Sequence, residues 1–315
     1  MSRVLVTGGA GFIGSHLCRF LADTGHDVVA LDLMGGPRQH QNAVSLSGVE
    51  LQRTDLLSTD LRRVISPEDA IVHLAGQPGV QSSWADGFDR HLDGNVRMSQ
   101  RILEAGLAAG ARRIVLASSS SVYGDTFGPL SEDLACVPVS PYGATKAAME
   151  LLANSYVARG LPTVCLRYFT TYGPRQRPDM AFHRMFLAGQ GGPPFPRRGD
   201  GQQTRAYTFV DDVVRATSTA LTAPLAPGSV INIAAGQSIS LNQALEVVGR
   251  LLGRRIPTVD LPAAAGDPQC PTPDTDRART LLGWSPRVSL SDGLAEQLRW
   301  HAPAQRRPVP TRLAS

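Results

Sequence analysis

Short apolar runs alternate with amphipathic stretches through the first half of the chain. The runs are rich in Val, Ile and Leu, as is typical of strands buried on both faces of a sheet, and they lie at residues 3–8, 27–32, 70–76, 113–119 and 162–169. The stretches "FIGSHLCRFLADTG" and "NVRMSQRILEAGLAAG" between them have helical periodicity. This alternation predicts right-handed βαβ units, and therefore an α/β fold with a doubly wound parallel (Rossmann) sheet.

The second half has a different pattern. "YGPRQRPD" and "GQGGPPFPRRGDGQQ" are rich in Gly, Pro and Arg, which predicts ligand-enclosing loops rather than more sheet. "VINIAAG" (230–236) predicts one more strand, and a helix is expected around 241–252. We therefore expect a Rossmann domain and a smaller C-terminal substrate-binding lobe. The domain takes residues 1–170 and about 204–236, the lobe about 171–203 and 237–302, and a flexible tail 303–315.

Composition excludes several classes of function. The chain has 315 residues, a net charge of +4 and scattered arginines, which suits an anionic small molecule and predicts no nucleic-acid partner. No apolar run is long enough to span a membrane, and "RVLVTGG" at the start leaves no room for a signal peptide, so we expect a cytoplasmic protein. Four dispersed cysteines without a CxxC pair predict neither disulfides nor a metal site.

A glycine-rich turn, "TGGAGFIG", joins the first predicted strand to the first predicted helix. Gly8 permits the tight turn, Gly11 lets the backbone approach a pyrophosphate, and Gly14 allows close packing of helix on strand. Asp32 ends the second predicted strand, where a carboxylate accepts hydrogen bonds from an adenosine ribose diol and repels a 2′-phosphate. These residues predict an NAD-binding domain and favour NAD over NADP.

Lys146 is the only lysine, although the chain holds 31 Lys and Arg residues. Tyr142 lies one helical turn before it, so the two side chains share a helix face. A nearby ammonium lowers the pKa of a phenol, and lysine also donates to ribose hydroxyls in a way that a planar guanidinium does not. The pair predicts a tyrosine that accepts a proton beside a nicotinamide.

Together with these residues, the spacing GxxGxxG, "TDL" (54–56), "HLAG" (73–76) and "ASSSSVYGD" (117–125) resemble the extended short-chain dehydrogenase/reductase family. In that family a serine hydrogen-bonds the substrate hydroxyl that is oxidised, and Ser119 takes its place here. The resemblance implies a Ser119–Tyr142–Lys146 catalytic set. It also implies further NAD contacts from Phe12, Ile13, Asp55, Leu56, Leu74 and Ala75.

The second half resembles the nucleotide-sugar branch of that family, in "LRYFTTYGPRQRPDMAFHRMF", "GDGQQTRAYTFVDDVVRA" and "AGDPQCPTPDTDRARTLLGWSP". This implies a UDP-sugar substrate and a homodimer. It also implies that Arg205 binds the diphosphate, Arg175 lines the sugar–phosphate channel and Arg198 lies near the uracil. Further substrate contacts are expected from Ser83, Ser120, Ser121, Thr170 and Asp267. Departures from the pattern are Thr170 for Asn, Ala206 for Asp and a missing arginine in "PAAAGD".

The motifs leave two reactions open after oxidation of the sugar at C4. Common 4,6-dehydratases carry Asp–Glu where this chain has Ser120 and Ser121, which favours a 4-epimerase. The chain as a whole, however, resembles the UDP-N-acetylhexosamine 5,6-dehydratases of tunicamycin biosynthesis. That resemblance implies elimination of water across C5–C6 of a UDP-N-acetylglucosamine-type sugar to an exo-glycal, in antibiotic or secondary-metabolite biosynthesis. We take the dehydratase as the first expectation and the UDP-hexose or UDP-N-acetylhexosamine 4-epimerase as its alternative.

A third hypothesis is a non-catalytic sensor of NAD or a nucleotide sugar. A sensor has no need of Ser119, Tyr142 and Lys146 together, so the complete set argues against this hypothesis.

Overall fold

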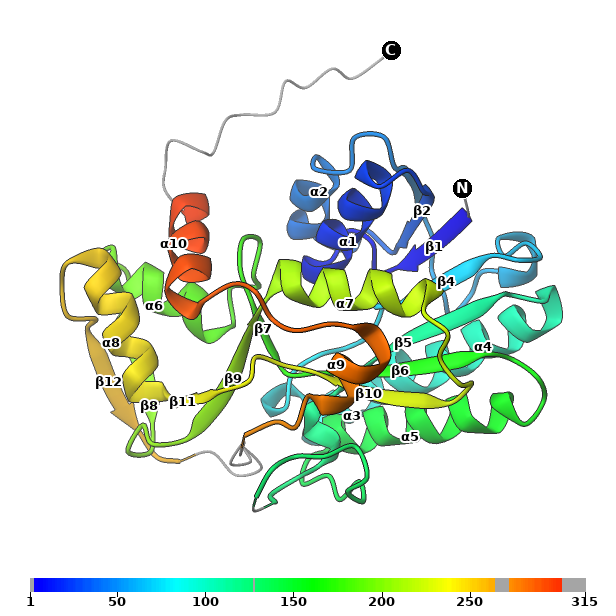
Figure 1. Ribbon diagram of the computed structural model, residues 1–315. Coiled ribbons are helices and arrows are strands. Elements are labelled where there is room, and N and C mark those ends of the chain that lie inside the picture. Colours follow the sequence, from blue (N-terminus) through cyan, green and yellow to red (C-terminus); the bar gives the residue numbers. More distant parts are fainter. Residues whose placement is uncertain (1–2, 127, 264–271, 302–315) are drawn as a thin grey trace, which may run out of the picture.

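The computed structural model describes residues 3–126, 128–263 and 272–301 (Figure 1). The predicted tail at 303–315 and the expected substrate contact Asp267 lie outside the described residues.

The larger part of the molecule is built on a parallel sheet of seven strands in the order β10-β6-β5-β4-β1-β2-β3. The strands are β1 (Arg3–Thr7), β2 (Asp27–Asp32), β3 (Glu50–Arg53), β4 (Ala70–His73), β5 (Arg113–Ser119), β6 (Thr163–Tyr168) and β10 (Ser229–Ile233). The doubly wound sheet predicted from the apolar runs is confirmed. Because the strand order reverses between β1 and β4, a crevice is expected at the carboxyl ends of these two strands.

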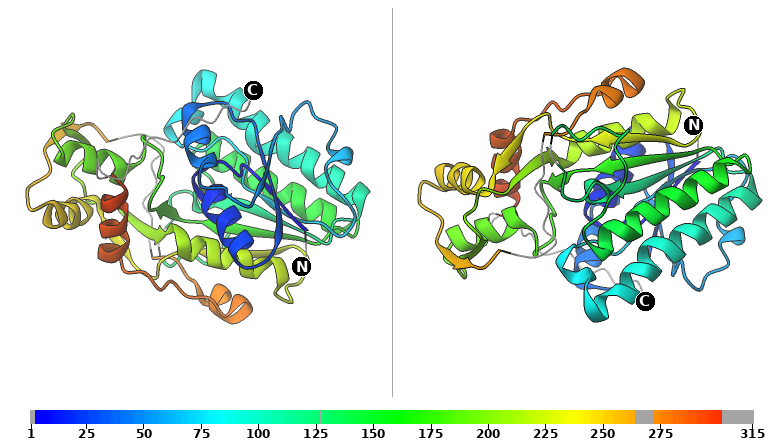
Figure 2. Two further views of the ribbon diagram at one scale, coloured as in Figure 1. Left: turned by 90° about the horizontal axis from the view of Figure 1, so that it is seen from above. Right: turned by 90° about the horizontal axis from the view of Figure 1, so that it is seen from below.

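Helices cover both faces of this sheet (Figures 1 and 2). On one face α1 (Phe12–Asp23) packs against α7 (Val210–Thr222), and on the other α4 (Met98–Ala109) packs against α5 (Pro141–Val157). Alternate strand residues enter the two cores, so that Val4 and Val6 face the first helix pair and Leu5 faces the second. The shorter α2 (Pro37–Ala43) and α3 (Phe88–His91) lie near the carboxyl ends of the strands.

A second, smaller group of elements lies beside the large sheet (Figure 1). It contains a three-stranded sheet ordered β11-β9-β7 and a two-stranded parallel pair β12-β8. The strands are β7 (Thr170–Tyr172), β8 (Phe195–Arg198), β9 (Thr204–Phe209), β11 (Ser238–Ser240) and β12 (Thr258–Leu261). The remaining α-helices are α6 (Ala181–Gly189), α8 (Leu241–Leu252), α9 (Asp276–Leu282) and α10 (Leu290–His301). The division into two lobes at the residues given above stays a prediction.

Two elements differ from the sequence expectation. Residues 189–203 were expected to form only loops, but Phe195–Arg198 form β8, which pairs with β12 about sixty residues later in the chain. Strand β3 was not predicted because its four residues, "ELQR", carry a single aliphatic side chain. Both strands are stabilised by a neighbour that a local pattern does not contain.

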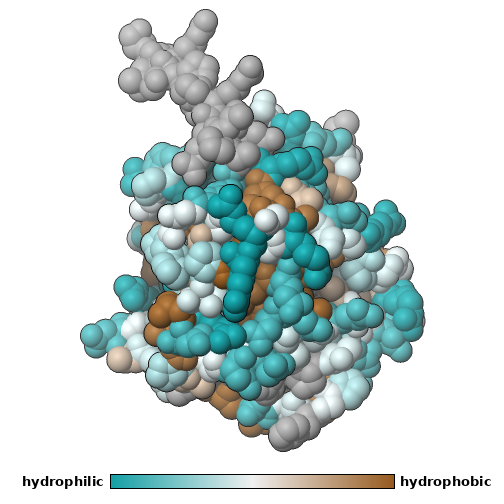
Figure 3. Space-filling model, turned by 90° about the vertical axis from the view of Figure 1, so that its left-hand side faces the viewer, coloured by the Kyte–Doolittle hydropathy of each residue, from teal (hydrophilic) through white to brown (hydrophobic). Residues whose placement is uncertain are grey.

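The face formed by the smaller group of elements is largely hydrophilic, with small hydrophobic patches between polar side chains (Figure 3). Among the described residues, no helix combines the length and the apolar character needed to cross a bilayer.

Asp212, at the start of α7, fastens the segment between α9 and α10 to the core. Its carboxylate is buried and accepts hydrogen bonds from the backbone N–H groups of Arg287 (3.0 Å) and Val288 (3.1 Å). The indole N–H of Trp284 donates to the Asp212 carbonyl oxygen at 2.9 Å. This segment leads into α10, so Asp212 helps to place that helix.

We expect Asp212→Ala to lower the free energy of unfolding by ~2–3 kcal/mol, because two part-buried backbone N–H groups lose a charged acceptor. The neighbouring Asp211, whose side chain is 58% exposed, supplies the matched control: Asp211→Ala should change the free energy by less than about 1 kcal/mol. Urea denaturation measures both, and equal losses would contradict this role of Asp212.

Candidate active site

The glycine turn between β1 and α1 forms a cradle that only glycine backbone fits. Gly8 has φ +68°, and a Cβ added there would lie 2.8 Å from the Ala75 nitrogen. A Cβ on Gly14 would lie 2.1 Å from the Gly8 carbonyl oxygen. Helix α1 begins after Gly11 without a side-chain cap, which leaves its first N–H groups available for an anion. The residues present therefore fit a dinucleotide pyrophosphate.

The acidic residues expected at the adenosine lie on the same cleft. Asp32 is 9% exposed and accepts from the backbone N–H groups of Ala10 (3.1 Å) and Met34 (2.9 Å), which fixes its carboxylate against the turn. Asp55 accepts from the Leu57 N–H at 2.9 Å. The other predicted cofactor contacts also line this cleft, namely Phe12, Ile13, Leu56, Leu74, Ala75, Tyr142 and Lys146.

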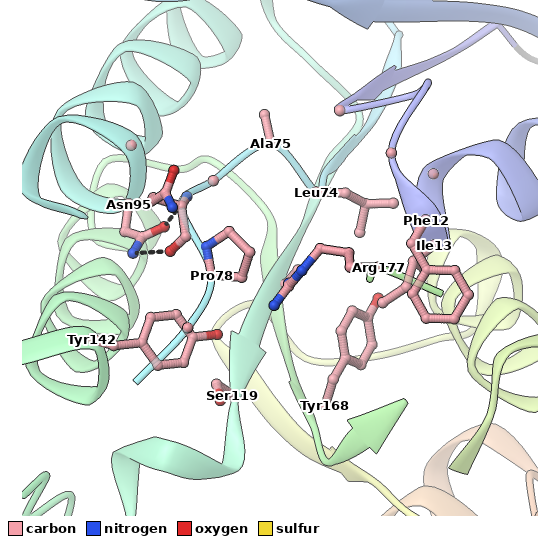
Figure 4. Close-up of a pocket in the computed structure, with 18 of the residues that line it drawn as sticks. Phe12, Ile13, Leu74, Ala75, Pro78, Asn95, Ser119, Tyr142, Tyr168 and Arg177 are labelled. Carbon is pink, nitrogen blue, oxygen red and sulfur yellow. Dashed lines mark hydrogen bonds between the residues drawn. The ribbon is translucent and has the colours of Figure 1, made fainter. Parts of the chain in front are cut away.

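The cleft has a volume of about 1080 Å³ and continues past the carboxyl ends of the strands to Ser119 and Tyr142 (Figure 4). Ser119 is the last residue of β5, and Tyr142 lies in the first turn of α5. Helix α5 begins here because Pro141 occupies its first position and the Ser140 hydroxyl accepts from the Gly143 N–H at 3.1 Å. Strand end and helix start thus bring the two hydroxyls together.

The environment of Tyr142 differs from the expectation. Burial raises the pKa of its phenol, whereas a hydrogen bond with Ser119 and the charge of Arg177 lower that pKa. Lys146 had been expected to act on the phenol directly, but it donates from Nζ to the Ala117 carbonyl oxygen at 2.8 Å. Its side chain is 7% exposed, and burial lowers the pKa of the ammonium to about 8.

A buried ion pair lies next to Ser119 and Lys146. Glu150, one helical turn after Lys146, binds Arg167 of β6 through two hydrogen bonds of 3.0 and 2.7 Å. The Ser118 hydroxyl donates to the same carboxylate. Helix α5 is thereby joined to β5 and β6 next to the catalytic candidates, and the Glu150 charge favours the protonated form of Lys146, which raises its pKa.

The side chains expected at the substrate divide into two groups. Ser120, Ser121, Thr170 and Arg205 line the cleft. Ser83 does not line it, because its hydroxyl is buried and donates to the Val80 carbonyl at 2.6 Å, and Ser82 faces the cleft instead.

The other two expected arginines are also placed elsewhere. Arg198 is exposed on β8 outside the cleft, since strand pairing with β12 directs this segment along the surface. Arg175 lines a second cavity between α2 and α10.

Three residues of the site were missed by the sequence analysis. Arg177 points into the cleft (Figure 4) and forms an ion pair with Asp179 at 2.8 Å. Asn95 donates to the Thr145 hydroxyl and to the Gln77 carbonyl, both at 3.0 Å, and so ties the loop after β4 to α5. The buried His91 ring packs edge-on against Tyr142, with 5.8 Å between centroids. In the sequence, Arg177 lies in "RPD" and Asn95 in "GN". Neither segment carries a local pattern that would mark its residue as part of the site, so the sequence analysis could not identify them.

The buried Lys146 ammonium predicts how the free energy of unfolding changes with pH. Because the pKa of Lys146 falls from 10.5 in the unfolded chain to about 8 in the fold, the unfolded state binds more protons between these pH values. The contribution of Lys146 to the free energy of unfolding therefore rises with pH, by roughly 3 kcal/mol across this window.

Comparison with Lys146→Met isolates this contribution, since every other group titrates in both proteins. The free energy of unfolding of the cofactor-free wild type, minus that of the variant, should rise between pH 8 and pH 10.5. A difference that does not change with pH would show that the ammonium is not desolvated.

Comparison with known proteins agrees with this geometry. Residues 4–234 match the model of the NAD dependent epimerase/dehydratase family. The chain is 38% identical over 307 residues to the uncharacterized UDP-glucose epimerase YtcB of Bacillus subtilis, covering 95% of this chain and 97% of that protein. It is 33% identical to the dTDP-glucose 4,6-dehydratase of Streptomyces griseus, with 95% of this chain and 94% of that one covered.

Among solved structures, the UDP-glucuronic acid 4-epimerase of Bacillus cereus in complex with UDP-glucuronic acid and NAD superimposes with a TM-score of 0.90. The two chains are 40% identical, and the match covers 95% of this chain and 98% of that one. The matched family model spans the glycine cradle, the Ser119–Tyr142 pair and Lys146, and the relatives match nearly the whole chain. This protein belongs to the NAD-dependent nucleotide-sugar epimerase/dehydratase family of extended short-chain dehydrogenases/reductases.

Proposed function

We propose that this protein is a UDP-sugar 4-epimerase whose preferred substrate carries a carboxylate, as in UDP-glucuronate. The observation that carries the proposal is the contact between Ser119 and Tyr142 at a place in the cleft where Ser120 and Ser121 are the next residues of the chain. This arrangement can take a proton from the C4 hydroxyl, and the next two side chains carry no acid or base for a second reaction.

Each residue of the set has a distinct task. Ser119 donates to or accepts from the sugar hydroxyl and places it against the Tyr142 oxygen, which takes the proton as C4 is oxidised and gives it back afterwards. Lys146 supplies positive charge in the same cleft and helps to keep the site pre-organised through its hydrogen bond to Ala117. NAD, which the glycine cradle and Asp32 would hold, would supply a hydride acceptor and donor for C4. The sugar must turn within the cleft for the return to reach the opposite face.

Elimination of water has weaker support. It requires an acid for the leaving hydroxyl and a base for the C5 proton. The carboxylates that line the described cleft are Asp32 and Asp55 in the predicted adenosine region, Asp93, which pairs with Arg97 at 2.9 Å, and Asp179, which pairs with Arg177. None adjoins Ser119 in the chain. The expected hexosamine dehydratase of antibiotic biosynthesis thus gives way to its alternative, the 4-epimerase.

The position of Arg177 favours a substrate whose sugar carries a carboxylate. Its guanidinium enters the cleft on the side of Tyr142, and its charge acts on that phenol. Asp179 occupies one side of the guanidinium through hydrogen bonds from Nε (3.0 Å) and Nη2 (2.8 Å), which leaves Nη1 to donate to a sugar carboxylate. The related Bacillus cereus protein is a UDP-glucuronic acid 4-epimerase crystallised with that compound.

We also propose that the protein acts as a homodimer through α4 and α5. The supporting feature is Leu151, a 71% exposed apolar side chain on the outer face of α5, which a second copy would cover.

Incubation with UDP-glucuronate and a trace of NAD tests the reaction. Proton NMR should show conversion to the C4 epimer with unchanged mass, and Tyr142→Phe should lower kcat at least ~100-fold, because the proton acceptor is lost. A product lighter by one water, with vinylic signals, would overturn the proposal in favour of the dehydratase. An absence of turnover with UDP-glucuronate, UDP-glucose and UDP-N-acetylglucosamine would favour the sensor.

Arg177→Met tests the substrate class. We expect its KM for UDP-glucuronate to rise about 10- to 100-fold, since a charge-assisted hydrogen bond is lost, while the KM for UDP-glucose changes little. Arg198→Met is the matched control, because it removes an arginine that lies outside the cleft. An equal rise for both sugars would contradict recognition of the carboxylate by Arg177.

A further inference from the structure

His91 is a buried titratable residue that the proposed mechanism does not use. It is 0% exposed and ends α3, a short helix that packs against α5. Its imidazole ring meets the Tyr142 ring edge-on, with 5.8 Å between centroids and 75° between planes, an arrangement that aromatic rings favour. Tyr142 is only half-buried, so its orientation depends on the side chains that contact it. Ser119 and His91 are two of these.

The backbone around His91 is fixed against the start of α5. A π-helical turn, η4 (Leu92–Arg97), follows His91 directly, and such turns are rare and frequently lie at functional sites. Asn95 of this turn donates to the hydroxyl of Thr145, which lies three residues after Tyr142 on α5. The segment thus contacts α5 at two points, through His91 and through Asn95. We therefore expect any movement of His91 away from Tyr142 to be a rotation of its side chain.

His91 also contacts the wall of the cleft. Its Nε2 lies 3.4 Å from the Ser82 hydroxyl oxygen, and that hydroxyl donates to the Gly79 carbonyl at 3.2 Å. Ser82, Gly79 and Tyr142 line the cleft, whereas His91 does not. The imidazole therefore lies behind the cleft, between a segment of its wall and the catalytic tyrosine. It would act on the reaction through these neighbours and not by touching the substrate.

The surroundings of His91 favour an uncharged ring. Its Nδ1 is buried without a hydrogen-bond partner among the residues that the structure describes. A neutral imidazole has one N–H donor, but a protonated one has two, and the second would be left unpaired here. Burial lowers the pKa of His91, and the charges of Arg90 and Lys146 lower it as well, although a hydrogen bond with the Ser82 backbone raises it.

The charged groups around His91 come from its own helix and from the elements packed against it. These elements are η3 (Ala85–Gly87), η4 and the first half of α5, while η2 (Gln81–Ser83) carries no charge. Besides the Tyr142 phenol, the titratable groups on them and on α3 are Asp86, Asp89, Arg90, Asp93, Arg97 and Lys146. Asp93 pairs with Arg97 at 2.9 Å. The groups whose charge acts on the imidazole are the two cations Arg90 and Lys146, so the local field disfavours protonation.

We propose that His91 is a positioning residue of the epimerase, whose uncharged ring holds the Tyr142 phenol in the orientation that accepts the C4 proton. The inference rests on the proposed function, because that function gives Tyr142 the proton. A protonated ring would rotate toward water, since a buried cation without an acceptor is costly, and the edge-on contact would be lost. Because the pKa of His91 lies below its usual 6.5, kcat should fall as the pH is lowered through that pKa.

The pH dependence of kcat, measured on the NAD-saturated enzyme with UDP-glucuronate, tests this coupling. Between pH 8 and pH 5 the wild type should lose activity with an apparent pKa below 6.5. His91→Phe keeps an aromatic ring but cannot be protonated. Its kcat should stay within about threefold of the wild type at pH 8 and should change little down to pH 5. Equal pH profiles for the two proteins would overturn the proposal.

His91→Ala removes the ring altogether. Its kcat at pH 8 should fall at least about tenfold while KM changes less than about threefold, because a misplaced proton acceptor slows the chemical step and leaves the substrate contacts intact. His40→Ala is the matched control and should behave as the wild type, since His40 is exposed on α2 and lies outside the cleft. An unchanged kcat, or a rise in KM alone, in His91→Ala would contradict the positioning of Tyr142.

NMR of the NAD-saturated protein separates this inference from the proposed function, because it needs no turnover. The ring resonances of Tyr142, assigned with Tyr142→Phe, should shift along the same pH curve as those of His91, and this shift should be absent in His91→Phe. Tyr142 resonances that do not follow the titration of His91 would overturn the inference. If they do follow it but no UDP-sugar is turned over, the proposed function fails and the placement of Tyr142 by His91 stands.

Discussion

The site depends on the buried ammonium group of Lys146 and on the contacts that hold it. A charge taken out of water is costly, and this one is retained because the Ala117 carbonyl accepts a hydrogen bond from it and Glu150 lies one turn further along α5. Glu150 is itself paired with Arg167 of the neighbouring strand. The cation is thus tied to β5, α5 and β6 together, and the first two of these elements carry Ser119 and Tyr142.

This arrangement also explains why the lysine stands alone in an arginine-rich chain. An ammonium is compact, its pKa falls readily on burial, and it can rotate from one hydrogen-bond partner to another. A guanidinium stays charged, and its donors are fixed in one plane. Elsewhere in the molecule the planar guanidinium donates two hydrogen bonds to one carboxylate. Arg167 binds Glu150 in this way, and Arg177 binds Asp179.

The sequence predicted those features whose cause is local. The seven-stranded sheet followed from apolar runs, except for β3, and the glycine cradle followed from a turn that requires positive φ at Gly8. His73 hydrogen-bonds Thr7 and Ser99, and burial lowers the pKa of its imidazole to about 3. Substrate contacts were harder to predict, because loops decide them. Ser83 turns inward while Ser82 faces the cleft, and Arg175 and Arg177, two residues apart, enter different cavities.

The central claim is that one hydrogen leaves C4 of the sugar and returns to the same carbon. UDP-glucuronate labelled with deuterium at C4 tests it most directly, in a single reaction followed by mass spectrometry and NMR. The account predicts that the C4 epimer keeps the deuterium at C4, without exchange into water. Loss of the label from a product of unchanged skeleton, or a product that has lost water, would contradict it.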